Sequence, residues 1–177
     1  MNNPWWQQVG STIAAEFSDL TDATETTRVV LRLAVAALLG GLLGWEREHQ
    51  GKAAGVRTHM LVAMGAALFV LVSQQIGMGP DDMSRVIQGI TAGVGFLCAG
   101  SILKGDRLGD VKGLTTAAGL WLTAAMGVAA GLGRELTAVL ATLLALTVLA
   151  LVPALVRLVE KPKSLLASEI QAGEKDA

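Results

Sequence analysis

The sequence predicts an all-α, polytopic membrane protein with about five transmembrane helices, preceded by an amphipathic interfacial helix. Composition supports this class, because apolar residues make up 52% of the 177 residues and charged residues only 16%, against about 25% charged residues in soluble domains. Mean hydropathy is +0.52. Helices are the expected spanning elements, since the edge N–H and C=O groups of open strands would go unsatisfied in lipid.

Five apolar segments form the predicted transmembrane domain, residues 27–159. Each is near the roughly 20 residues that a helix needs to cross a bilayer. Glycine is frequent within them, as transmembrane helices tolerate. The segments cover approximately residues 27–45, 58–76, 86–103, 114–132 and 136–159.

The distribution of lysine and arginine predicts the orientation of these segments. Cations gather in the first loop, the third loop and the C-terminal region, while the alternate loops are poor in them. Because cytoplasmic loops carry the excess of Lys and Arg, we expect the N-terminus outside and the C-terminus in the cytoplasm. Five crossings also require the two ends to lie on opposite sides.

Two flanking segments complete the predicted organisation. Residues 1–26 carry apolar residues at helical spacing, including Trp5 and Trp6, and predict an amphipathic segment on the outer surface; a partly disordered tail is the alternative. Residues 160–177 are polar and predict a cytoplasmic tail. We expect Pro162 to end the last helix.

The segment GWEREHQGKAAGVRTH, from Gly44 to His59, is the most charged connection between apolar segments. Anions at the end of one helix and cations at the start of the next are each disfavoured by the helix dipole, so pairing across the loop would relieve both. We therefore predict a charged cytoplasmic cluster with ion pairs among its acidic and basic members; a solvated orienting loop is the alternative. The cluster comprises Glu46, Arg47, Glu48, Arg57, Thr58 and His59.

If the ion pairs form, Arg57→Ala should lower thermal stability in detergent more than Lys52→Ala. Arg32, one turn into the first apolar segment, is expected to extend toward the outer surface, or else to find a buried partner near Gln88.

The second cytoplasmic loop is glycine-rich and alternates acidic with basic residues. Its two carboxylates could hold Mg²⁺ in part, although the adjacent cations argue against a strong site, and a helix N-terminus could instead hold an anion. Metal binding is therefore left open. The candidate residues are Lys104, Asp106, Asp110 and Lys112, with Thr115 and Thr116 expected to cap the following helix.

Small residues at i, i+4 spacing predict close helix packing, within this chain or against another copy in a homodimer. The candidates are Gly40, Gly44, Gly89, Gly93, Gly95 and Gly100. Cys98, the single cysteine, is expected to be a small buried packing residue.

No nucleophile–base arrangement appears, and His49 and His59 are the only histidines. We therefore expect neither an enzyme nor a bound cofactor.

The stretches 31–69, 89–104 and 111–133 resemble the membrane domain of the MgtC/SapB family. The matching motifs are Glu46–Arg47, Arg57–Thr58–His59, Gly93–Gly95–Phe96–Leu97 and Leu114–Thr115–Thr116–Ala117–Ala118. The resemblance implies a bacterial inner-membrane protein linked to growth at low Mg²⁺ and, in intracellular pathogens, to virulence. It also implies a possible partner, the F-type ATP synthase. Many family members carry a soluble C-terminal domain, and we expect this chain to lack it.

The leading hypothesis is a non-enzymatic protein that binds or modulates a membrane partner, or alters ion homeostasis. The alternative is a transporter or channel for an ion or small solute. The polar groups available to line a path are Gln88, Thr91, Ser101 and Thr123, and no Asp or Glu lies near the predicted midplane.

Overall fold

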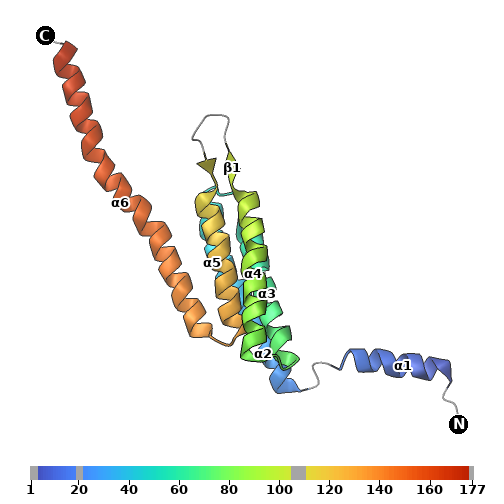
Figure 1. Ribbon diagram of the computed structural model, residues 1–177. Helices are drawn as coiled ribbons and strands as arrows, with labels where there is room; N and C mark the ends of the chain where they lie inside the picture. Colours follow the sequence, from blue (N-terminus) through green and yellow to red (C-terminus); the bar gives the residue numbers. More distant parts are fainter. Residues whose placement is uncertain (1–3, 19–21, 105–110, 176–177) are drawn as a thin grey trace.

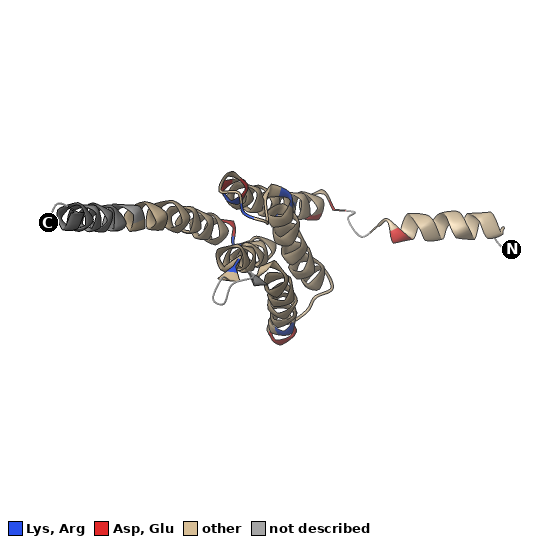
Figure 2. Cartoon of the chain, turned by 90° about the horizontal axis from the view of Figure 1, so that it is seen from above, with Lys and Arg blue, Asp and Glu red and all other residues tan. Residues whose placement is uncertain are grey.

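The computed structural model describes residues 4–18, 22–104 and 111–175, with side chains described as far as Val156 apart from those of residues 103 and 104. The described chain is almost entirely helical, as predicted. Its helices are α1 (Trp5–Glu16), α2 (Ala23–His49), α3 (Val56–Gln75), α4 (Pro80–Ser101), α5 (Leu114–Gly131) and α6 (Glu135–Lys175). Helices α2 to α5 lie side by side, and α1 and α6 extend from this bundle in opposite directions (Figures 1 and 2).

Four helices in the described part of the chain are long and apolar enough to cross a membrane: α2, α3, α5 and residues 135–156 of α6. They correspond to four of the five predicted segments. The remaining segment forms α4, which packs beside α3 and α5. Its first turns carry three charged residues, Asp81, Asp82 and Arg85, and it is not among the four helices that are long and apolar enough to span a membrane. A fifth crossing by α4, and the orientation of the bundle, remain predictions.

The centre of the bundle is formed where α2, α3 and α5 meet. Small side chains fill it, and one buried cluster consists only of alanines: Ala36, Ala63, Ala67 and Ala130. Glycines bring the backbones into contact. A Cβ on Gly40 would lie 2.6 Å from the carbonyl oxygen of His59, and one on Gly131 would lie 2.7 Å from that of Ala67. Small residues permit this close approach in membrane helices.

Gly40 and Gly44 make the predicted close contacts, whereas the glycines of α4 pack against no described residue of this chain, and their packing against another copy stays a prediction. A Cβ on Gly44 would lie 2.7 Å from the Cα of Val56. By contrast, a Cβ on Gly89, Gly93, Gly95 or Gly100 would meet nothing within 4 Å among the described residues. The spacing is the same on both helices, but no described neighbour closes on the glycines of α4, and Gly100 borders a cavity lined in part by Thr58 of α3 and Leu120 of α5. Cys98 is buried as expected, and its Sγ donates to the Ala117 carbonyl at 3.1 Å.

Arg32 links several helices at the end of the bundle that lies opposite the 46–59 loop. Its Nη1 donates to Gln74 Oε1 at 2.7 Å and to the Gly131 carbonyl at 2.8 Å, and its Nε lies 3.8 Å from Glu135 Oε1. One side chain thereby connects α2, α3, α5 and α6. The expected partner near Gln88 is wrong, because the polar ends of α3 and α5 supply acceptors closer to the arginine.

The two flanking segments differ in how they meet the predictions. Helix α1 stands apart from the bundle (Figure 1) and buries none of its residues, so its membrane-surface position remains a prediction. Helix α6 begins beside α5 and diverges from it (Figure 1). It continues through Pro162 to Lys175, so the expected end at Pro162 is wrong. A proline inside a helix removes one backbone hydrogen bond and can bend the helix without ending it.

We predict that Gly127→Ala destabilises the protein, because a Cβ at this position overlaps the Ala63 carbonyl on α3. Overpacking of this kind costs about 1–3 kcal/mol, and the unfolding midpoint in detergent should fall accordingly. Gly93→Ala on α4 is the matched control, since its Cβ meets open space. Equal midpoints for the two variants would contradict the close approach of α3 and α5.

Candidate functional site

A buried polar cluster lies where α2 ends and α3 and α5 begin, at the end of the bundle that we call the loop end. Arg47, in the last turn of α2, is only 3% exposed. Its Nε donates to Glu46 Oε2 at 2.5 Å and its Nη2 donates to Glu46 Oε1 at 2.7 Å. Successive residues on a helix do not face each other, so both side chains bend along the helix surface to make this two-point contact. The pairing lets a buried cation keep its charge.

His59, on the first turns of α3, is completely buried beside this ion pair. Its Nδ1 lies 2.9 Å from the Gly55 carbonyl oxygen, a contact that places the proton of a neutral imidazole on Nδ1. Nε2 is then an acceptor, and it is the one buried side-chain nitrogen or oxygen in the described residues without a hydrogen-bond partner. Leaving such an acceptor unpaired costs about 1–3 kcal/mol.

Gly119 of α5 forms the wall that faces the cluster. A Cβ added there would lie 3.6 Å from His59 Nε2 and 4.0 Å from Arg47 Cδ. Residue 119 therefore borders both side chains at once, and three helices enclose the site. The sequence offered only a weak indication of this role, because Gly119 is one of several small residues on its helix.

Glu48 joins no ion pair among the described residues, contrary to the prediction. Its Oε2 instead accepts the backbone N–H of Val56 at 2.9 Å. The first N–H groups of a helix lack intrahelical partners and lie at its positive end. The N-terminus of α3 therefore provides the hydrogen-bond donor for the Glu48 carboxylate. The chain turns back between the helices through Gly51, whose φ is +64°.

The predicted ion pairs with Arg57 are also wrong within the described part of the chain. Arg57 is exposed and makes no ion pair there. The Arg47–Glu46 contact is the one ion pair of the predicted cluster that the structure contains. Thr58 is half-buried and borders two cavities at the loop end. A functional role for the cluster stays a prediction.

The second predicted loop is described only in part. Residues 103–104 and 111–112 form a short antiparallel hairpin, β1 (Leu103–Lys104) and β2 (Val111–Lys112), with Leu103 opposite Lys112. Lys112 is exposed. Asp106 and Asp110 lie outside the described residues, so the possible Mg²⁺ site there stays untested.

The capping role expected for Thr115 and Thr116 is wrong, because α5 begins one residue earlier. Gly113, with a φ of +95°, precedes the first helical residue, and no side chain caps the helix. Thr115 is exposed and Thr116 is buried within the first turn. Thr116 thus contributes to the packed wall of α5.

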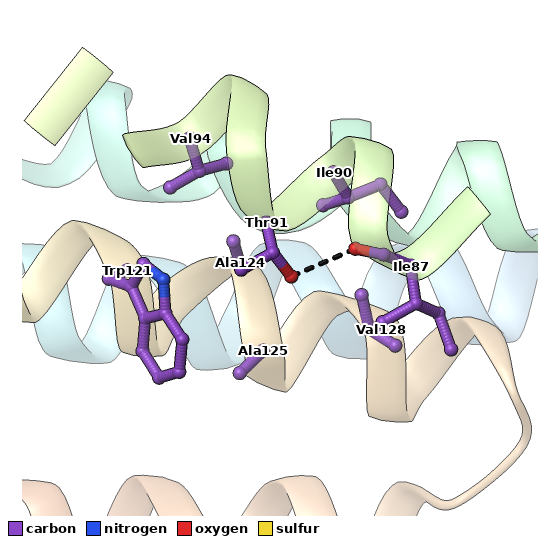
Figure 3. A pocket seen from close by; sticks show the side chains of 8 residues that line it. All are labelled: Ile87, Ile90, Thr91, Val94, Trp121, Ala124, Ala125 and Val128. Carbon is purple, nitrogen blue, oxygen red and sulfur yellow. Dashed lines mark hydrogen bonds between the residues drawn. The ribbon is translucent and has the colours of Figure 1, made fainter. Parts of the chain in front are cut away.

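Two buried threonine hydroxyls contact carbonyls of their own helices. Thr123 donates to the Gly119 carbonyl at 2.8 Å, and the Thr142 hydroxyl lies 2.8 Å from the Ala138 carbonyl and 3.0 Å from Met126 Sδ on α5. Thr91 and Ser101, which sequence analysis considered as path-lining groups, donate to Ile87 and Cys98 carbonyls at 2.8 and 2.7 Å. Figure 3 shows the Thr91 bond within an apolar groove of about 220 Å³ between α4 and α5.

We predict that Arg47→Ala lowers the free energy of unfolding by about 3 kcal/mol, because it leaves the Glu46 carboxylate without its partner in a largely buried position. Arg57→Ala and Lys52→Ala should each change it by less than about 0.5 kcal/mol, as exposed substitutions do. Thermal unfolding in detergent measures all three. A larger loss from Arg57→Ala than from Arg47→Ala would contradict the placement of the ion pair.

Comparison with known proteins supports one family. Residues 33–158 match the MgtC family. Protein MgtC of Brucella abortus is 46% identical over 128 residues, covering 72% of this chain and 52% of the relative. Protein MgtC of Salmonella typhimurium is 44% identical over 117 residues, covering 66% of this chain and 49% of the relative.

A third relative carries a transport name. The "Putative magnesium transporter YhiD" of Escherichia coli K12 is 39% identical over 134 residues, covering 70% of this chain and 60% of the relative. The chain thus spans about half to three fifths of the length of these relatives. No solved structure matches it. The family match, the identities and the membrane-spanning helices together show that this chain belongs to the MgtC family.

Proposed function

We propose that this protein is a non-enzymatic component of the bacterial inner membrane that takes part in Mg²⁺ handling by binding a membrane-protein partner. We infer the role in Mg²⁺ handling from the name of the Escherichia coli relative, a putative magnesium transporter, and from the family resemblance. The close packing of the helices in the bundle supports partner binding as the mode of action.

The observation that carries the proposal is the backbone contact among α2, α3 and α5. Gly40 and Gly44 bring α2 against α3 between Val56 and Ala63, and Gly127 and Gly131 bring α5 against α3 between Ala63 and Val70. Helices in backbone contact leave no room between them for a hydrated ion. The buried Thr123 hydroxyl donates to a carbonyl of its own helix, which further disfavours a polar path through this centre.

A surface for a partner is available on α4. Its glycines face open space, and Phe96 beside them is 86% exposed. Small residues with an adjacent aromatic side chain allow another transmembrane helix to approach closely. The family resemblance makes the F-type ATP synthase the first partner to test and a second copy of this chain the next. A role in virulence would depend on the host bacterium.

The second candidate function is transport of Mg²⁺ or another small solute. The name of the Escherichia coli relative favours it. In that case, the three-helix packing would have to separate during transport, because its backbone contacts fill the centre.

A paired experiment distinguishes these functions. Purified protein in liposomes should give no Mg²⁺ flux above empty liposomes. A photo-crosslinking residue in place of Phe96 on α4 should capture a subunit of the F-type ATP synthase or a second copy in cells grown at low Mg²⁺. The same residue in place of Leu140, an exposed position on α6, is the control. Saturable Mg²⁺ flux, or equal capture from both positions, would overturn the partner-binding proposal.

A further inference from the structure

Two adjoining cavities of opposite character lie at the loop end of the bundle. The first, of about 400 Å³, is polar and is bordered by Glu48, Lys52 and Arg57. The second, of about 320 Å³, is mainly apolar and is bordered by Phe96, Leu97 and Leu120. Ala53 and Thr58 border both cavities, so the two form one continuous amphipathic site.

The two halves are arranged in the order of a membrane interface. The polar half is built from the loop between α2 and α3 and from the first turn of α3. The apolar half reaches Phe96 and Leu97, which precede the last residue of α4 by five and four positions. At a rise of about 1.5 Å per residue, these side chains begin roughly 6–7 Å below the helix end. With the loop end at a membrane surface, as the sequence predicts, the polar half would face the headgroup layer and the apolar half the acyl chains.

The polar half has an excess of positive charge. Lys52 and Arg57 are exposed and make no ion pair with the described residues. The one carboxylate that borders this cavity belongs to Glu48, and it accepts the Val56 N–H. The Thr58 hydroxyl adds a hydrogen-bond donor at the junction of the two halves. These groups suit a phosphate better than a neutral or cationic group.

We propose that this amphipathic site binds an anionic phospholipid of the surrounding bilayer. The lipid phosphate lies against Lys52, Arg57 and the Thr58 hydroxyl, and an acyl chain lies along Phe96 and Leu97. A free phosphate would use only the polar half, whereas a phospholipid matches both halves in the order in which the membrane presents them. The proposal concerns a ligand site and is independent of the partner-binding function.

Native mass spectrometry of the protein released from nanodiscs tests the charge requirement. In mixed nanodiscs of phosphatidylglycerol and phosphatidylcholine, the unchanged protein should retain phosphatidylglycerol preferentially. The double variant Lys52→Gln, Arg57→Gln should lower that preference about 25-fold, since each cation near an anionic lipid contributes roughly a factor of five. Arg85→Gln, an exposed cation at the opposite end of α4, is the control and should leave it unchanged.

A second variant tests the apolar half. Gly100 borders the apolar cavity, and a Cβ added there meets nothing within 4 Å. Gly100→Leu should therefore extend into the cavity and reduce lipid retention. Gly93→Leu, on the same helix but away from the cavity, should not. Equal retention of the two lipids by the unchanged protein would overturn the proposal. Displacement of the lipid by millimolar glycerol phosphate would do so as well, since it would identify a free phosphate site.

Discussion

The backbone contact of α3 with α2 and α5 is the constraint on which the rest of the structure depends. Glycines at 40 and 44 on α2, and at 127 and 131 on α5, let both helices approach the carbonyl oxygens of α3. Only small side chains fit between helices at this separation, and the alanine cluster fills the space that remains. Any larger side chain at these positions would separate the three helices that enclose the buried polar groups.

Because the helices meet so closely, their charged groups are satisfied at the two ends of the bundle. At one end, Arg32 binds acceptors from α3, α5 and α6. At the loop end, Arg47 is paired with Glu46, and Glu48 receives the first N–H of α3. Among the described residues, His59 Nε2 is the one buried side-chain nitrogen or oxygen without a hydrogen-bond partner. This unpaired acceptor lies beside the buried Arg47. A small rearrangement at the loop end would therefore give it a hydrogen bond.

The proposed partner surface and the proposed lipid site meet on α4, because both include Phe96. The packed centre supports partner binding over transport, and α4 presents its glycines and Phe96 outward. The amphipathic site lies between the loop and the last turns of α4. A lipid held there would contact the helix that we propose as the partner surface, which gives the membrane composition a physical route to that surface.

The sequence by itself determined the helices and the class of protein, because segment length, low charge and glycine spacing are local properties. It also identified Glu46, Arg47 and His59 as neighbours in one charged segment. The tertiary structure alone decided which small faces pack: Gly40 and Gly44 meet α3, while Gly89 and Gly93 on α4 do not. It likewise assigned Glu48 to the Val56 N–H and Arg32 to Gln74. The spacing of residues in the sequence shows that a small-residue face or a charged side chain exists. Which residue it contacts depends on how helices that are distant in the sequence pack together.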